Sequence, residues 1–363
     1  MNISLLRKID KWIFGFLVLT LKIFPKRSKP PKEIKKILVI KLWAVGDAVL
    51  SLPMIYGLKK NYPKAKIEVF CHKNNSFVYE GHADKINYFP GISMIFKLRY
   101  YDFVFDTEPF LNVSAICSFW LGKFRIGFIN QFRSSLYNRQ VSFSRERHIV
   151  QNYLEMIRAL GIRYDTDKLI KINTENKMLL KFKKKIGKGK FVGITPSISG
   201  SVKSRMWPLE NMAKVIEYLT KKGYKVIIID NKENQLKVNE LISYLSNKED
   251  ILDYTGKTTW KESVCLISLC DIYISNDTGP LHLAAAQGVK AIGLFGPNLP
   301  ALWGPYGKGN ISLYKHVECS PCIRNDLGIF PECIYKGTDN YQICMKKIKV
   351  EEVIETIDKL IKK

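Results

Sequence analysis

Short apolar runs alternate with amphipathic segments along most of the chain. The runs have the length of strands that are buried on both faces, and they cover residues 37–40, 66–70, 103–106, 191–194, 225–229, 272–275 and 290–295. Segments with apolar residues three and four positions apart predict helices at residues 48–61, 151–160, 210–222, 259–269 and 350–360. Strands that alternate with helices predict open α/β sheets.

The predicted elements fall into two series, separated by polar, lysine-rich sequence at residues 163–190 that we interpret as an interdomain connection. A chain of 363 residues is expected to hold about two domains. We therefore predict a basic amphipathic segment and linker at residues 1–34, a Rossmann-like domain at 35–170, and a second Rossmann-like domain at 171–363. Two such doubly wound domains in series are expected to face a central cleft, where these folds bind ligands.

The first domain is preceded by an apolar run at residues 12–24, which Lys22 interrupts. Thirteen residues are too few for a membrane-spanning helix, which needs about 20, and no small-residue cleavage site follows. The first 36 residues carry ten Lys and Arg against Asp10 and Glu33. A short apolar helix with basic flanks is typical of a segment that lies in the interface of an anionic membrane. The alternative is a helix packed on the protein's own core.

The composition limits the kinds of partner. A hydrophobic content of 46% excludes global disorder, and a formal net charge of +25 indicates an acidic partner. Nucleic acid, an anionic membrane surface and a phosphorylated substrate all satisfy that requirement.

Four of the eight cysteines cluster near the C-terminus: Cys319, Cys322, Cys333 and Cys344. They could bind a structural zinc ion, although such sites usually show two paired knuckles and only one CxxC is present. Buried thiols and a local disulfide are the alternatives. The other four cysteines stand in apolar contexts and are expected to be buried thiols.

Residues 271–306 hold the most distinctive candidate site. A buried strand leads into the polar turn Asn276–Pro280, and an alanine-rich helix then ends at Gly288. A polar turn with a glycine exposes backbone N–H groups at a helix N-terminus, where an anion can bind. The alternative is that Asp277 only caps the helix.

A second candidate lies where the first strand meets its helix, at Gly46 and Asp47. Gly46 permits a tight turn or a close ligand approach. Asp47 is placed to act as a general base, or alternatively to cap the helix that we expect to begin at Ala48.

Hydroxyl and basic residues follow the first strand of the second domain. Thr195 and Ser197, with the Ser199–Ser201 stretch, leave backbone N–H groups accessible, and Lys203 and Arg205 could hold a diphosphate. The spacing matches neither GxxxxGK[ST] nor GxGxxG. Glu233 follows a later strand and is either a ribose ligand or a solvated charge.

Arginines concentrate at residues 125–147 of the first domain, with Arg125 and Arg147 at the ends of the group. Arginine favours bidentate binding of phosphate or carboxylate, so the group indicates an anionic acceptor. A solvated charged face is the alternative.

Taken together, these motifs resemble those of the glycosyltransferase family 9 heptosyltransferases, which build the inner core of bacterial lipopolysaccharide. The resemblance covers most of residues 36–360. It rests on residues 37–53 with Gly46-Asp47, the basic-x-Trp-Pro motif at 203–208, the Ser275–Ala286 block, Phe295-Gly296-Pro297 and Trp303-Gly304-Pro305-Tyr306. Trp43 departs from the pattern, since a small residue is expected there.

The resemblance implies a GT-B fold and an inverting, metal-independent transfer of a sugar, heptose from ADP-heptose, onto a lipid-linked anionic acceptor. It makes Asp47 the catalytic base and assigns Gly46, Arg125 and Arg147 to the acceptor. The donor residues that it implies are Thr195, Ser197, Lys203, Arg205, Glu233, Asp277, Thr278, Gly279 and His282.

The same resemblance implies no cofactor apart from the zinc alternative above. The expected partners are a nucleotide sugar, a phosphorylated lipid-linked sugar and an anionic membrane surface, but not nucleic acid. The expected location is cytoplasmic, on the inner face of the bacterial inner membrane. The alternatives are a transferase of this family that uses another nucleotide sugar, a nucleotide-dependent oxidoreductase, and a zinc-bearing nucleic-acid-binding protein.

Overall fold

The computed structural model describes residues 3–24, 29–129, 131–198, 200 and 202–362. The chain forms two compact units. Unit 1 is Met1–Thr166 with Asn325–Ile329, and unit 2 is Asp167–Arg324 with Phe330–Lys363. The division after Thr166 falls close to the predicted boundary between residues 170 and 171. Part of the predicted linker, residues 25–28, and two residues of the predicted anion loop, Ser199 and Ser201, lie outside the described residues.

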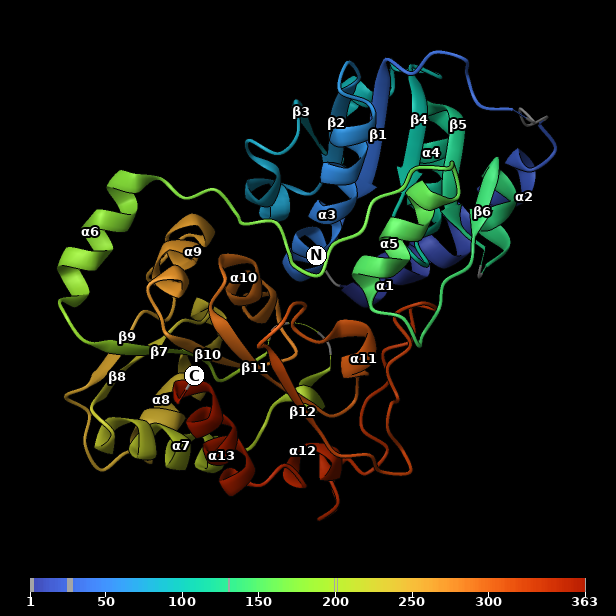
Figure 1. Ribbon diagram of the computed structural model, residues 1–363. Coiled ribbons are helices and arrows are strands. Elements are labelled where there is room, and N and C mark those ends of the chain that lie inside the picture. Colours follow the sequence, from blue (N-terminus) through green and yellow to red (C-terminus); the bar gives the residue numbers. More distant parts are fainter. Residues whose placement is uncertain (1–2, 25–28, 130, 199, 201, 363) are drawn as a thin grey trace. The chain divides into compact units, whose positions relative to one another are not determined.

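Unit 1 is built on a sheet of parallel strands in the order β3-β2-β1-β4-β5-β6 (Figure 1). The strands are β1 (Lys36–Lys41), β2 (Lys66–Cys71), β3 (Lys85–Tyr88), β4 (Tyr101–Asp106), β5 (Gly122–Phe128) and β6 (Arg139–Val141). The helices are α1 (Ile3–Ile9), α2 (Gly15–Leu21), α3 (Val45–Asn61), α4 (Asn112–Leu121) and α5 (Ile149–Arg158).

Unit 2 has a second parallel sheet, in the order β12-β11-β10-β7-β8-β9. Its strands are β7 (Lys190–Thr195), β8 (Tyr224–Ile228), β9 (Ile251–Asp253), β10 (Ile272–Asn276), β11 (Lys290–Phe295) and β12 (Ile311–Tyr314). Its helices are α6 (Asn176–Ile186), α7 (Leu209–Lys221), α8 (Gln235–Ser243), α9 (Trp260–Ser268), α10 (Gly279–Gln287), α11 (Pro300–Trp303), α12 (Ile343–Lys346) and α13 (Val350–Ile361).

Both sheets follow the same rule of connection. Numbered within its own unit, each has the order 3-2-1-4-5-6, which is the doubly wound Rossmann order. The order reverses between β1 and β4 in unit 1, and between β7 and β10 in unit 2. The predicted fold class, two Rossmann-like α/β domains, is confirmed. In such sheets, ligands bind outside the carboxyl ends of the strands at the point of reversal.

The central strands carry the core because they are apolar on both faces. Each of β1, β7, β10 and β11 is buried along all but its first residue or along its whole length. The edge strands β3, β6, β9 and β12 are short and only partly buried, so their sequences lack a continuous apolar run and the pattern did not predict them. Helix α6 lies inside the predicted polar connection, so that part of the prediction is wrong.

The N-terminal segment packs on α4 of unit 1 by one face. Asp10 accepts hydrogen bonds from the backbone N–H groups of Asn112 (3.0 Å) and Val113 (2.9 Å) at the start of α4. Gly15 and Val18 of α2 are buried below it. The helix begins at Ile3, earlier than the predicted Trp12, and continues through a π-helical turn, Asp10–Phe14. The predicted packing on the protein's own core is thus correct for this face.

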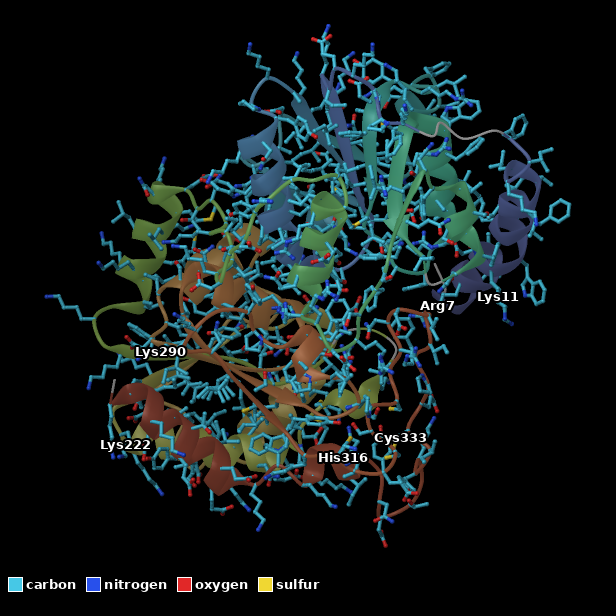
Figure 2. The ribbon with its side chains drawn as sticks, turned by 45° about the vertical axis from the view of Figure 1, so that its right-hand side comes forward. Arg7, Lys11, Lys222, Lys290, His316 and Cys333 are labelled. Carbon is cyan, nitrogen blue, oxygen red and sulfur yellow. The ribbon has the colours of Figure 1, made fainter. Side chains whose placement is uncertain are left out.

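The opposite face of the segment is apolar and exposed. Trp12, Phe16 and Ile23 are 70%, 65% and 77% exposed, and Arg7 and Lys11 lie on the same segment (Figure 2). Among the described residues, the structure contains no helix of the length and apolarity required to cross a membrane.

Candidate active site

The predicted site residues of each unit gather at the strand ends where the sheet order reverses. In unit 1, Gly46 and Asp47 follow β1. In unit 2, Thr195 and Ser197 follow β7, whereas Asp277, Thr278 and Gly279 follow β10. These are the positions where doubly wound sheets bind their ligands.

The loop that presents Asp47 has a constrained backbone. Helix α3 begins at Val45, and its N-cap residue is Ala44, which has a positive φ of 64°. Positive φ is unfavourable for alanine, so the surrounding structure must hold the loop in place. Asp47 lies in the first helical turn and is half-buried. The alternative that Asp47 caps a helix starting at Ala48 is therefore wrong.

A buried ion pair that the sequence did not reveal holds this loop. Glu108, two residues beyond β4, accepts hydrogen bonds from the backbone N–H groups of Leu42 (2.7 Å) and Trp43 (3.1 Å). Its other carboxylate oxygen lies 3.2 Å from Nζ of Lys41, and both side chains are at most 4% exposed. Burial by itself lowers the pKa of Lys41, but Glu108, together with smaller effects of Tyr153, Asp47 and Tyr79, raises the pKa well above its usual value. Trp43, the unexpected large residue, is partly exposed and stacks on His72.

The arginines of residues 125–147 do not form one surface. Arg133 is fully buried and donates to Asp106 at 3.1 Å, and Ser114 and Tyr137 donate to the same carboxylate oxygen. Burial raises the pKa of Asp106 despite this arginine. Arg133 is therefore part of the core of unit 1.

The two arginines assigned to the acceptor have different surroundings. Arg125 is buried on β5 with its guanidinium over the ring of Phe119, and burial lowers its pKa to about 10. Arg147 lies before α5, is exposed, and forms an ion pair with Glu155 at 3.0 Å. Since Arg125 is buried inside unit 1, Arg147 is the more accessible of the two for an anionic ligand.

The turn between β10 and α10 is organised by Asp277, which does not cap the helix. The N-cap residue is Thr278. The Asp277 carboxylate accepts a hydrogen bond from the side-chain amide of Asn298 (2.9 Å) and lies 3.5 Å from the guanidinium of Arg205. The partners of this carboxylate within unit 2 are therefore the side chains of Asn298 and Arg205. Arg205 also donates to the backbone oxygen of Asp277 at 2.9 Å.

The basic-x-Trp-Pro motif is joined to the same turn through Asn276. The Asn276 side chain accepts from the backbone N–H of Trp207 (2.9 Å) and donates to the backbone oxygen of Pro196 (2.8 Å). Arg205 is therefore held at the N-terminus of α10, whereas Lys203 of the same motif is exposed. An arginine at a helix N-terminus adds a positive charge where the helix dipole already favours an anion.

The remaining donor residues surround the ends of β7 and β8. Thr195 shares a hydrogen bond with the Tyr273 hydroxyl at 2.7 Å, and Ser197 donates from its backbone N–H and its hydroxyl to Asp230. Glu233 is exposed on the short 3₁₀ helix Lys232–Asn234. Asp230 was not a predicted site residue, although it lies only two residues beyond β8, the strand that precedes Glu233.

His282 lies on α10 and is fully buried. Burial lowers the pKa of His282 to about 4, against a smaller opposite effect of Asp277, so the imidazole is neutral near pH 7. Its Nδ1 atom is buried, and the described chain offers it no hydrogen-bond partner. A neutral imidazole with a polar atom to satisfy can serve as a ligand contact.

A sequence model of glycosyltransferase family 9 (heptosyltransferase) matches residues 95–327. The chain belongs to this family. A lipooligosaccharide heptosyltransferase 2 of Campylobacter jejuni subsp. jejuni serotype O:6 is 27% identical over 340 residues, which cover 87% of this chain and 96% of the relative.

Solved structures share the fold. The structure of E. coli ADP-heptose lps heptosyltransferase II aligns with a TM-score of 0.71 at 19% identity, over 90% of this chain and 98% of that one. A family 9 glycosyltransferase from Veillonella parvula aligns with a TM-score of 0.73 at 22% identity, over 92% and 99%. The predicted family and the GT-B architecture are thus confirmed, and the oxidoreductase and nucleic-acid-binding alternatives lose their support.

In unit 2, the predicted donor loops are joined by side-chain hydrogen bonds at the N-terminus of α10. One cation, one carboxylate and two amide side chains tie the loops after β7, β10 and β11 together around the N-terminus of α10: Arg205, Asp277, Asn276 and Asn298. Asn298 and Asn276 were not among the predicted site residues. Their only signal in the sequence is their position next to Pro297 and Asp277 in the matched motifs.

Proposed function

We propose that this glycosyltransferase moves heptose from ADP-heptose onto a lipid-linked, phosphorylated sugar during assembly of the lipopolysaccharide core. The family and the heptosyltransferase relatives support the sugar and the pathway. The donor assignment is carried by one observation, the hydrogen bond that fixes Arg205 on the backbone oxygen of Asp277 at the N-terminus of α10.

In this proposal, unit 2 binds the donor. The two phosphates of ADP-heptose lie against Arg205, Lys203 and the backbone N–H groups that begin α10. Thr195 and Ser197 line the same strand ends, and Glu233 accepts hydrogen bonds from the ribose. His282 and the turn residues Thr278 and Gly279 contact the sugar or its phosphate.

Unit 1 supplies the base and binds the acceptor through Gly46 and Arg147, whereas Arg125 is buried. Asp47 removes the proton from the acceptor hydroxyl while that oxygen attacks the anomeric carbon of heptose. The bond from the anomeric carbon to the phosphate oxygen breaks, and ADP leaves with the bonding electrons. Attack from the face opposite the leaving group inverts the anomeric centre, through a transition state like the oxocarbenium ion of glycosidases.

We assign stabilisation of the departing diphosphate to protein groups rather than to a catalytic metal. Negative charge develops on the phosphate oxygen as its bond to carbon breaks, and a fixed guanidinium with helix N–H groups stabilises that charge without rearrangement. Transfer should therefore keep its rate when a chelator is added during the assay. A rate that requires added Mg²⁺ or Mn²⁺ would contradict this part of the proposal.

A direct test combines donor binding with turnover. ADP-heptose should raise the midpoint of thermal unfolding by mass action, whereas UDP- and GDP-linked sugars at the same concentration should not. Release of ADP should then require a lipopolysaccharide acceptor that lacks heptose. Stabilisation and turnover with a different nucleotide sugar would leave the family intact but overturn the choice of ADP-heptose.

Asp47→Asn tests the base. A general base contributes about a hundredfold to ten-thousandfold in rate, so kcat should fall by that order while ADP-heptose still stabilises the protein. Asp167→Asn is the matched control, because Asp167 belongs to unit 2, where its side chain is 71% exposed and pairs with Lys308. Full transfer by Asp47→Asn would refute the mechanism.

We also propose that the exposed face of the N-terminal segment binds an anionic membrane surface on the cytoplasmic side of the inner membrane, where a lipid-linked acceptor would be found. Trp12 and Phe16, on the helical segment, and Ile23, just after α2, are exposed, and the Asp10 contacts hold this segment against unit 1. Interfacial helices combine such aromatic residues with basic side chains, and each Lys or Arg near an anionic surface adds about 1 kcal/mol.

Sedimentation with lipid vesicles tests the membrane proposal. The protein should pellet with vesicles of phosphatidylcholine and phosphatidylglycerol, less so at high salt, and Trp12→Ser with Phe16→Ser should abolish pelleting. Leu236→Ser is the control, because Leu236 is 82% exposed on unit 2. Equal loss of binding in that control, or no binding by the unmodified protein, would contradict the proposal.

A further inference from the structure

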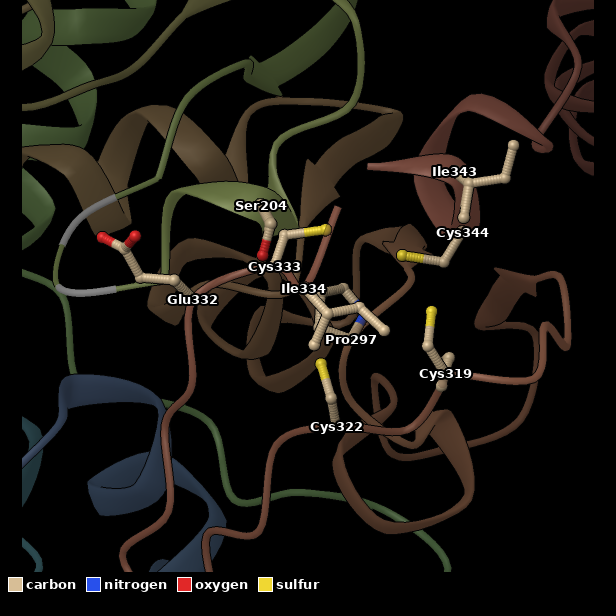
Figure 3. A pocket seen from close by; sticks show the side chains of 10 residues that line it. Ser204, Pro297, Cys319, Cys322, Glu332, Cys333, Ile334, Ile343 and Cys344 are labelled. Carbon is tan, nitrogen blue, oxygen red and sulfur yellow. The ribbon is translucent and has the colours of Figure 1, made fainter. Parts of the chain in front are cut away.

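The cysteine cluster near the C-terminus lies apart from the residues that we assign to sugar transfer. Cys319 and Cys322 follow β12, Cys333 comes from the next loop, and Cys344 lies on α12. All four side chains line one cavity of about 20 Å³ inside unit 2. In Figure 3, their sulfur atoms point from different sides toward the same space.

The backbone around the cavity is fixed by the turn after β11. The N–H group of Cys322 donates to the backbone oxygen of Pro297 at 3.1 Å, and the hydroxyl of Ser320 donates to the backbone oxygen of Gly296. A Cβ atom on Gly296 would lie 2.8 Å from the sulfur of Cys344. Gly296 therefore allows Cys344 to approach the cavity, and the loop carrying Cys322 is held in position before any ligand binds.

The chemistry of the lining favours a cation. Within the described residues that line the cavity there is no Lys, Arg or His, and the one charged side chain is the carboxylate of Glu332. Four thiol groups from three segments meet at one space, which is the number of ligands that a tetrahedral ion needs. Tetrahedral sulfur ligation is typical of zinc and of iron. A cavity of this volume holds one ion or one water molecule.

We propose that Cys319, Cys322, Cys333 and Cys344 bind one thiophilic metal ion, Zn²⁺ or iron, in a structural tetrathiolate site. Among the described residues, no group of three or more His, Cys, Asp or Glu side chains is placed so that it could hold a metal ion without rearrangement. The four thiols must therefore close on the ion to sulfur–metal distances of about 2.3 Å. Each thiol loses its proton as its sulfur–metal bond forms, so four protons are released to solvent for each ion bound.

The role that we assign to the ion is to tie α12 and the two cysteine loops to the turn after β11. This turn also carries Asn298, the partner of Asp277. The ion would thus stabilise unit 2 without contacting the reacting atoms. Its consequences can be measured without any assay of sugar transfer.

Elemental analysis of the full-length protein, purified under reducing conditions without chelator, is the first test. We expect about one zinc or iron ion per chain, and the metal analysis distinguishes the two. Replacing the ion by Co²⁺ should produce the visible absorption of tetrahedral cobalt–thiolate coordination. Less than about one ion per ten chains, with no cobalt spectrum after addition of Co²⁺, would overturn the proposal.

Variants locate the site. Cys333→Ser should lower the metal content severalfold or more, whereas Cys117→Ser, at a half-buried thiol of unit 1, should leave it unchanged. If Cys333→Ser fails to fold, removal of the metal from the unmodified protein by a chelator should lower its thermal midpoint, and added Zn²⁺ should restore it. An equal loss of metal in Cys117→Ser would contradict the proposal. So would a metal-free protein whose measured mass is lower by two hydrogens for each disulfide, because the cysteines would then form disulfides instead of binding an ion.

Discussion

Replacing Glu108 by Gln removes the charge from the buried pair that holds the loop before Asp47. The carboxylate lies 3.2 Å from Nζ of Lys41 and accepts from the N–H groups of Leu42 and Trp43. Glutamine keeps the shape and one acceptor oxygen, but its amide N–H₂ cannot neutralise the ammonium. The variant therefore leaves Lys41 charged, buried and without its main partner.

The expected loss of stability follows from the geometry. At 3.2 Å, two unit charges attract by about 5 kcal/mol for an effective dielectric constant of about 20. Part of this is offset because Glu108 no longer has to be desolvated as an ion. Measured losses on removing one partner of a buried pair are about 3–5 kcal/mol, and we expect a value near the lower end of that range.

Chemical denaturation of the unmodified and Glu108→Gln proteins at pH 7, followed by tryptophan fluorescence, measures this loss. Glu240→Gln is the control, because the pair of Glu240 with Lys237 is 39% and 50% exposed and should contribute at most about 1 kcal/mol. Lys41→Met combined with Glu108→Gln should recover most of the stability, since no charge is then buried. A loss no larger than in Glu240→Gln, or no recovery in the double variant, would refute the reasoning.

The pH dependence gives an independent check. In the unmodified protein the pKa of Lys41 is raised, so its contribution to stability is complete below the unfolded pKa of about 10.4 and is lost as the pH rises through the folded pKa. In Glu108→Gln, burial is opposed only by the smaller effects of Tyr153, Asp47 and Tyr79, so the pKa of Lys41 in the folded variant should fall. The penalty in the variant should then shrink as the pH rises toward 10. A difference in stability that stays constant from pH 7 to pH 10 would contradict the assignment.

Three further predictions concern other buried groups. The pKa of His282 is lowered to about 4, so its contribution to stability is complete above pH 6.5 and is lost as the pH falls to 4. Denaturation measured at each pH over that window should show the unmodified protein losing about 3 kcal/mol more stability than His282→Gln. Gly296→Ala should lower the free energy of unfolding, measured by thermal unfolding, by about 1–3 kcal/mol, because the new Cβ would lie 2.5 Å from the sulfur of Met345. Gly15→Ala is the control and should cause no loss of stability, because the atom nearest to its Cβ would be 3.5 Å away. Arg133→Met leaves Asp106 buried without its cation and should cost about 3–5 kcal/mol in denaturation, and adding Asp106→Asn should restore part of it.

The sequence predicted what depends on local pattern. The strand, turn and helix at residues 272–287 were found because apolar periodicity, turn residues and the terminal Gly288 all lie within one short stretch. Gly288 has the expected left-handed backbone, with a φ of 81°. The same kind of local signal placed Asp47 between the first strand and its helix, and the structure has it in the first turn of α3.

The sequence did not predict pairings between distant residues. Glu108 reaches the loop at Leu42 over a separation of 66 positions, and Asn298 reaches Asp277 from the next strand end. Nothing in the local composition marks either side chain as buried and paired. Arg133 was grouped with surface arginines because arginine is seldom fully buried. Its buried position is explained by the carboxylate of Asp106 and the backbone oxygens of Leu111 and Glu108, which accept hydrogen bonds from its guanidinium.

The loops after β7, β10 and β11 act as one body because two adjacent residues of the β10–α10 turn hold them together. Asn276 binds the loops after β7 through Pro196 and Trp207, while Asp277 binds Arg205 and, through Asn298, the loop after β11. A substitution at either position therefore disturbs several loops at once. A conservative change such as Asp277→Asn should weaken donor binding mainly by releasing Arg205, since asparagine keeps an acceptor for Asn298 but lacks the charge. Loss of ADP-heptose binding without loss of thermal stability would identify that release, whereas unchanged donor affinity would show that Arg205 is positioned by the backbone oxygen of residue 277 alone.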